Sequence, residues 1–237
     1  GSILAARETR TGTETDVGNP AEAERMLRAA FERHDRDPRL ARELILTLLE
    51  RGDMAEAREI ARQAIGRHPE DAALAQVGEA LQANSRVEAL VWLIDRQANE
   101  TELERAISKH AVYQREGMEA ERLAVLDELV ELAPEEPRVL ELRFLRAMAE
   151  DDSERLARLV EVAERTNADD LGGLTFRSRA AAHEGELEDA IAASEQAIAR
   201  GSASPAVYRL LAAQQRAAGR LTEAIRTLEQ ALEIKPD

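Results

Sequence analysis

Apolar residues recur at helical spacing along most of the chain, in pairs of segments separated by short polar turns. The stretch 205–237 is the clearest example, because it predicts two amphipathic helices joined by a turn at Gly219. The same arrangement occurs one step upstream, around Gly185. From Pro20 onward, the pattern predicts pairs of antiparallel helices and no sheet.

The helix pairs recur with a fixed period. Gly185 and Gly219 are 34 residues apart, and so are Gly18 and Gly52, a period typical of a repeat array. Counting back from the last pair gives seven repeats, which are expected to start at Leu4, Pro38, Ala72, Leu103, Pro137, Leu171 and Pro205. Only 31 residues separate Ala72 from Leu103, so the third repeat is expected to be irregular.

Small residues, glycines and capping residues lie at fixed positions in these repeats. Alanine recurs at position 20 (Ala23, Ala57, Ala190, Ala224) and position 27 (Ala30, Ala64, Ala163, Ala197, Ala231). Small side chains seven residues apart on one helix face let a second helix approach closely. Glycine recurs at position 15, where it closes the first helix in the left-handed conformation. Helix caps are expected at Asp37, Thr101 with Glu104, and Ser204.

The last repeat carries a specific set of residue types: Tyr208, Leu211, Ala212, Gly219, Ala224, Ala231 and Pro236 at positions 4, 7, 8, 15, 20, 27 and 32. This set resembles the tetratricopeptide repeat. The resemblance implies an all-α fold, a right-handed superhelical solenoid of about seven helix-turn-helix repeats of 34 residues. Residues 1–19 fit the pattern poorly and are expected to form an irregular lead-in to a solenoid over residues 20–237.

The resemblance also implies a function. In that family the first helices of successive repeats line a concave groove that binds proteins or peptides. The positions that face the groove hold Arg39, Arg42, Arg138, Arg179, His183, Arg209 and Arg216. Arginine suits carboxylates, so an acidic protein or peptide segment is the expected partner. The alternative is that arginine is simply the default basic residue here, since Lys109 and Lys235 are the only lysines.

Composition narrows the partners further. The formal net charge of −15 disfavours nucleic acid, because phosphate binding needs a positive footprint. No run of apolar residues is long enough to span a membrane, and without cysteine there is no disulfide framework. Both the bacterial cytoplasm and the periplasm fit this composition. Residues 116–136 hold eight acidic residues and one arginine, which is either a solvated helix face or a docking surface for a basic partner.

Two irregular features have a structural and a functional interpretation. Trp92, the only tryptophan, lies in the irregular third repeat, where it either fills the junction or anchors a partner. Position 7 is basic in three successive repeats, at Lys109, Arg143 and Arg177. Their stems are expected to lie along apolar surface, with the charged heads reaching water or a neighbouring acid.

The residues that carry catalytic chemistry do not form a recognisable set. The four histidines are far apart and none has a metal-binding spacing, and no phosphate loop or nucleophile motif is present. The pairs Asp151–Asp152 and Asp169–Asp170 are explained by helix capping. We therefore expect neither enzymatic activity nor a metal or cofactor.

The final helix carries Ile225, Leu228 and Leu232 at helical spacing with no further helix after it in this sequence. Repeats bury their apolar faces against their neighbours, so these side chains are expected to be partly bare. Either the native protein continues past Asp237 or this end contacts another chain. The alternative function is therefore a structural protein that assembles through its ends.

Overall fold

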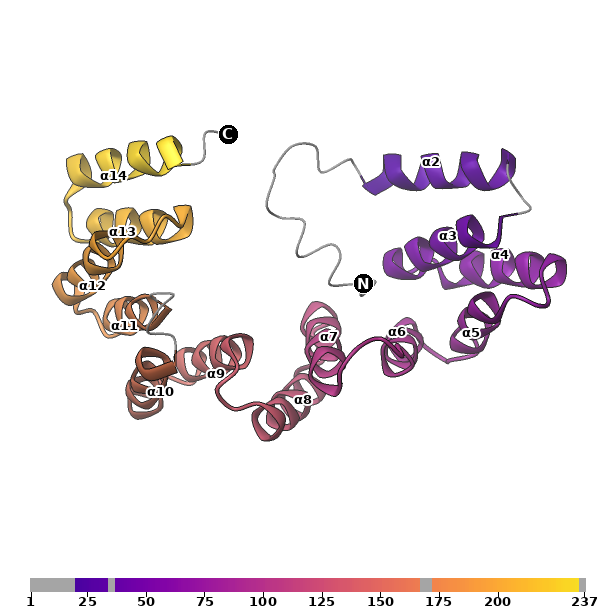
Figure 1. The fold of residues 1–237 in the computed structure, drawn as a ribbon, viewed down its shortest axis with the longest axis horizontal. Coiled ribbons are helices and arrows are strands. Elements are labelled where there is room, and N and C mark those ends of the chain that lie inside the picture. The colour runs from indigo at the N-terminus through magenta and orange to yellow at the C-terminus, as the bar shows by residue number, and fades with distance from the viewer. Residues whose placement is uncertain (1–19, 34–36, 167–171, 235–237) are drawn as a thin grey trace. The chain divides into compact units, whose positions relative to one another are not determined.

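The computed structural model describes residues 20–33, 37–166 and 172–234, so the expected lead-in at 1–19 lies outside the described residues. The described residues form thirteen α-helices and no strand (Figure 1), which confirms the predicted all-α class. The chain divides into two compact units, residues 1–128 and 129–237, with the boundary inside one helix.

The helices of the first unit are α2 (Pro20–Arg33), α3 (Pro38–Arg51), α4 (Met54–Arg67), α5 (Ala72–Ala80), α6 (Arg86–Asp95) and α7 (Glu102–Arg115). The unit boundary lies within α8 (Glu119–Leu132). The second unit continues with α9 (Pro137–Ala149), α10 (Ser153–Thr166), α11 (Gly172–His183), α12 (Leu187–Ala199), α13 (Pro205–Ala217) and α14 (Leu221–Ile234). Helices α3, α5, α9 and α13 begin at residues where repeats are expected to start.

Left-handed residues close the tight turns between paired helices. Gly52 has φ 95°, and its N–H donates to carbonyls of the last turn of α3. A side chain at this φ would be strained, which is why glycine recurs there. Asp151 occupies the equivalent position after α9 with φ 52°, and Asp is one of the few other residues that adopt this conformation. The turn geometry is therefore kept where the glycine is lost.

Of the N-caps predicted at Asp37, Thr101 and Ser204, the first two are present. The Thr101 hydroxyl accepts from the Glu104 N–H, and the Glu104 carboxylate accepts from the Thr101 N–H, so the predicted capping box is confirmed. The Asp37 carboxylate accepts from the N–H of Arg39. The prediction for Ser204 is wrong, because its side chain makes no capping hydrogen bond. Proline at the first helical position presets φ, so α13 starts there without that bond.

The core of the first unit is aliphatic and centres on α3, whose Leu44, Ile45 and Leu48 are fully buried. The irregular junction between α5 and α6 is held by Arg58, which donates to the carbonyls of Leu81 and Ala83 at 2.9 Å each. Trp92 is half-buried against the same core, and the guanidinium of Arg96 lies 3.7 Å from its ring centroid. These contacts favour the interpretation of Trp92 as a filler.

The core of the second unit has an aromatic centre between α9 and α11. The rings of Phe144 and Phe176 meet edge to face, with their centroids 4.6 Å apart. Where α11 crosses α10, a side chain at Gly173 would place its Cβ 2.5 Å from the Cα of Glu164. Only glycine allows this close crossing, which brings α11 down onto the Leu156 and Leu159 face of α10.

A chain of buried polar side chains links α11, α12 and α13. The hydroxyls of Ser178 and Ser194 lie 2.6 Å apart, and Ser194 donates to Gln214 Oε1 at 2.9 Å. Gln214 Nε2 lies 2.6 Å from Ser178 Oγ and 3.3 Å from the Ser178 carbonyl oxygen. All three residues are buried, and each polar side chain has a partner, so the chain of hydrogen bonds fixes three helices against one another.

Candidate binding surface on the second unit

The groove residues expected from the sequence are divided between the two units. Arg39 and Arg42 lie on α3 in the first unit, where Arg42 has its guanidinium 3.6 Å from the carboxylate of Glu43. The other five lie in the second unit: Arg138 on α9, Arg179 and His183 on α11, Arg209 and Arg216 on α13. The second unit therefore holds the larger candidate surface.

Hydrogen bonds join α9 to α11 and α11 to α13. Arg179 on α11 donates to both carboxylate oxygens of Glu141 on α9, at 2.7 and 2.8 Å. Gln214 on α13 donates to the carbonyl of Ser178 on α11. These three are the first helices of successive helix pairs, which Figure 1 shows stacked along the second unit. The first helices thus form a continuous row.

The outward sides of these helices carry arginine, alanine and leucine. On α9, Arg138 and Leu145 are exposed and lie three and four residues from Glu141, on its helix face. On α13, Arg209, Ala213 and Arg216 are exposed on one side, opposite the buried residues Val207, Leu211 and Gln214. We call the set Arg138, Leu145, Arg209, Ala213 and Arg216 the arginine face.

Arg179 differs from the arginines of this face because it is already neutralised. Besides its bidentate contact with Glu141, its guanidinium lies 4.8 Å from the centroid of Phe144 and 5.9 Å from that of Phe176. Its charge is thus balanced and its side chain is positioned by the aromatic pair. His183 also has an acidic neighbour, with Nε2 3.0 Å from Asp151 Oδ1. Arg179 and His183 therefore both contact carboxylates of the chain itself.

The arginine face keeps three unneutralised charges. Arg138, Arg209 and Arg216 make no ion pair with any residue that the structure describes. They lie on a chain of net charge −15, where carboxylates outnumber basic groups. Exposed arginines without an ionic partner are candidates for contact with anionic groups.

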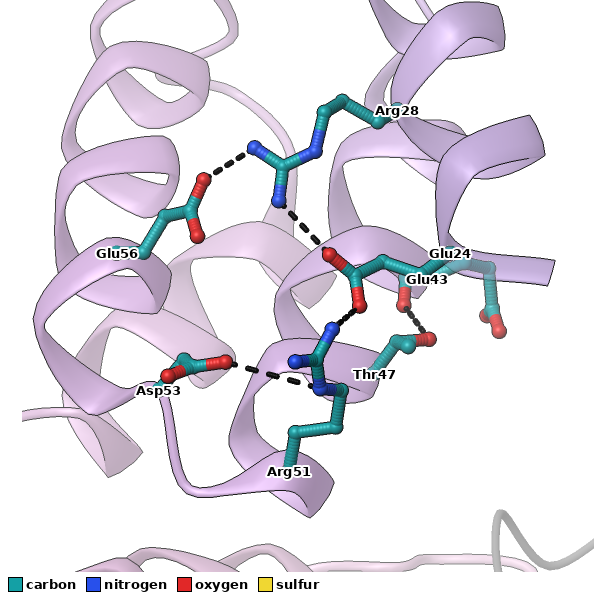
Figure 2. Close-up of polar contacts among 7 residues, drawn as sticks. All are labelled: Glu24, Arg28, Glu43, Thr47, Arg51, Asp53 and Glu56. Carbon is teal, nitrogen blue, oxygen red and sulfur yellow. Dashed lines mark hydrogen bonds and ion pairs between the residues drawn. The ribbon is translucent and has the colours of Figure 1, made fainter. Parts of the chain in front are cut away.

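A second charged cluster, in the first unit, is not apparent from the sequence (Figure 2). Glu24 on α2 is only 7% exposed, and its carboxylate accepts from Arg28 Nη2 at 2.9 Å and from Arg51 on α3. Arg28 also donates to Glu56 on α4, and the Nε of Arg51 lies 3.8 Å from Asp53. The cluster joins α2 to α3 and α4, so its role is to hold these helices together.

The electrostatics of this cluster follow from its hydrogen bonds. The hydrogen bond from Arg28 lowers the pKa of Glu56, and the same bond raises the pKa of Arg28. Each partner thus stabilises the charged form of the other. No sequence signal marks this cluster, because Glu24 and Arg51 meet only once α2 lies across α3. Both of its arginines are ion-paired within the unit.

The charged groups of the basic residues at position 7 each contact a nearby acceptor, in agreement with the sequence prediction. Lys109 Nζ lies 3.2 Å from Asp95 Oδ1. Arg143 donates to the carbonyl of Pro134 at 2.7 Å, and Arg177 pairs with Glu164. These three heads are held by the protein itself and do not extend the arginine face.

Other kinds of site find little support in the described ranges. No group of three or more metal-ligating side chains is found there. Asp152 caps α10 by accepting from the N–H of Arg155 at 2.9 Å, whereas Asp169–Asp170 lies outside the described residues. Within the same ranges, no helix is both long and apolar enough to cross a bilayer.

The helical pairs, their left-handed turns and their row of first helices define an α-helical repeat protein. A model of the tetratricopeptide repeat matches residues 15–72 and 175–237, about half of the chain. The chain therefore belongs to the tetratricopeptide repeat family. Members of this family are generally non-enzymatic scaffolds for protein interactions.

One solved structure with a TM-score above 0.5 supports the same fold. A tetratricopeptide repeat protein from Parabacteroides merdae matches with a TM-score of 0.56 at 14% identity, over 92% of this chain and 88% of its own. MamA matches with a TM-score of 0.45 at 16% identity, over 64% of this chain and 88% of its own. A comparison with curated protein sequences gives no significant match. At these identities the likeness concerns the fold alone.

Proposed function

We propose that the chain is a protein-binding scaffold whose arginine face binds an acidic segment of another protein. The observation that carries this proposal is the contrast within one row of helices. Arg179 is neutralised by Glu141, whereas Arg138, Arg209 and Arg216 are exposed without an ionic partner among the described residues. Charges left unpaired on an acidic chain are available to a ligand.

The chemistry of the face favours a carboxylate-bearing segment with small or apolar residues between its acids. A guanidinium donates two parallel hydrogen bonds to a carboxylate, and such bonds are roughly twice as strong as neutral ones. The exposed Ala213 between Arg209 and Arg216 leaves room for a backbone to approach α13. Leu145 is 44% exposed on α9 and offers one apolar contact. The face thus combines arginines that can orient a carboxylate with small and apolar side chains that can contact the rest of the segment.

The test uses a panel of short labelled peptides, graded from acidic to basic at equal length. We expect the acidic peptides to bind best, and added salt to weaken the binding because the exposed charges are screened. The double variant Arg209→Ala with Arg216→Ala should bind the best peptide about tenfold or more weakly, since each charged hydrogen bond contributes about 1.5–3 kcal/mol.

A matched control removes the same charge elsewhere. The double variant Arg158→Ala with Arg200→Ala also loses two exposed arginines, but from the second helices α10 and α12 and their ends. It should bind like the unmodified chain. If both double variants bound the peptide equally weakly, the loss of affinity would come from the change in net charge. The arginine face would then not be a binding site. A panel without preference for acidic peptides would contradict the proposal directly.

A further inference from the structure

Helix α14 carries an apolar stripe that no other described part of the chain covers. Leu221, Ile225, Leu228 and Leu232 are 60%, 60%, 44% and 58% exposed. The side of α14 that packs inward is different, because Ala224, Thr227 and Ala231 are buried there, and Thr227 donates to Gln215 of α13 at 2.8 Å. The stripe lies beside this inward side, about a quarter turn around the helix.

The stripe is bordered by charges on the side away from α13. Arg226 and Glu229 are both exposed there, three residues apart. Because α13 occupies one side of the stripe, a partner helix that packs on the stripe would lie next to Arg226 and Glu229 on the other side. A partner helix must therefore carry an apolar stripe of its own. Beside that stripe it needs an acidic residue opposite Arg226 and a basic residue opposite Glu229.

We propose that a second copy of the same chain covers this stripe, with the two α14 helices antiparallel about a two-fold axis. The apolar residues are spaced four, three and four apart, so reversing the helix reproduces the spacing. Leu221 then faces Leu232 of the second copy, and Ile225 faces Leu228. Any heptad stripe has this spacing, so the apolar residues alone do not select the partner.

The charges select the second copy. In this antiparallel register, Arg226 of one chain comes beside Glu229 of the other, and the two-fold axis forms the pair twice. A parallel arrangement lacks these pairs and aligns the helix dipoles unfavourably, whereas the antiparallel arrangement opposes them. Self-complementarity of this kind is what a two-fold interface requires, because the same patch serves both subunits.

The association is expected to be weak. One pair of helices of this length buries less area than the roughly 1,200 Å² at which stable interfaces begin. Solution mass measured by sedimentation velocity should therefore rise from monomer to dimer only toward high concentration, about 0.1–1 mM. Leu228→Glu places a charge in the centre of the stripe and should keep the chain monomeric throughout this range.

The matched control is Met26→Glu, which places the same charge on α2, at a side chain that is 69% exposed. It should associate like the unmodified chain, and circular dichroism should show both variants equally helical. A chain that stays monomeric at every concentration, or a dimer that Leu228→Glu leaves intact, would overturn the proposal.

Charge reversal tests the register itself. Arg226→Glu and Glu229→Arg should each weaken self-association about three- to tenfold, because both cross-pairs become repulsive. A mixture of the two variants restores both pairs, so it should form a mixed dimer more tightly than either variant pairs with itself. A mixture that associates no better than its components would exclude the antiparallel α14 pair. None of these substitutions touches the arginine face, so peptide binding there is tested separately.

Discussion

Two sets of arginines, one in each unit, differ in whether a carboxylate lies within reach. In the first unit, Arg28 and Arg51 converge on the buried carboxylate of Glu24 and are further engaged by Glu56 and Asp53. In the second unit, Arg138, Arg209 and Arg216 lie exposed on the arginine face with no ionic partner among the described residues. The residue type is the same, but the first set holds helices together and the second is available to a partner.

The difference comes from helix crossing rather than from local sequence. An arginine becomes structural when a neighbouring helix brings a carboxylate within reach, as α2 does for Arg51 of α3. On the outward side of α13, no described helix brings a carboxylate to Arg209 or Arg216. A basic residue at a groove-facing position is therefore a binding candidate only after its neighbours are known.

The largest loss of stability is expected from a substitution of Glu24, the carboxylate that Arg28 and Arg51 share. Glu24→Gln keeps the size of the side chain but removes the charge that two arginines share, which should cost about 1–3 kcal/mol of unfolding free energy. Urea unfolding followed by the fluorescence of Trp92, the only tryptophan, reports on the first unit. Glu70→Gln alters a carboxylate of the same unit that is 77% exposed and should leave the midpoint unchanged.

Single substitutions of Arg51 and Arg216 compare what a paired and an unpaired arginine contribute to the free energy of unfolding. Arg51→Ala should lower the unfolding free energy by about 1 kcal/mol, because it removes a charged partner from Glu24. Arg216→Ala should change it by less than about 0.5 kcal/mol, as for a surface residue without partners. Thermal or urea unfolding of both variants gives the two values. Equal losses would show that Arg216 has a structural partner as well, and the distinction between engaged and available arginines would fail.

A smaller effect is expected from pH, again in the first unit. His110 on α7 is 2% exposed and its Nε2 has no hydrogen-bond partner, so burial lowers its pKa, with a further contribution from Arg122 and an opposing one from Glu119. The unfolded chain then binds a proton more readily than the folded one, so stability is lost as the pH falls below about 6.5.

Trp92 fluorescence during urea unfolding at pH 7.5 and pH 5.5 measures this loss. His110→Leu removes the titrating group, so its stability should vary less over this pH range than that of the unmodified chain. An equal pH dependence in the variant would assign the effect to other groups.

With the exception of the cap at Ser204, the sequence predictions hold where the cause lies within one helix or one tight turn. The capping box of Thr101 and Glu104 and the left-handed Gly52 both depend on residues within one helix pair. Sequence reasoning fails where the partner comes from an independently placed helix. The cluster around Glu24 and the bidentate contact of Arg179 with Glu141, 38 residues away, depend on crossings that no local pattern encodes.

The buried chain of Ser178, Ser194 and Gln214 bears on how the protein avoids misassembly. Helices of similar repeats have similar apolar faces, so a helix that slips by one turn, or docks against the wrong repeat, still buries much of its hydrophobic surface. A slipped α13 would instead leave the Gln214 amide dry and without its hydrogen-bond partners, while the serine hydroxyls would keep only each other, a penalty that apolar packing alone does not impose. These three polar side chains thus favour the native alignment of α11, α12 and α13 over alignments that would bury the same apolar area.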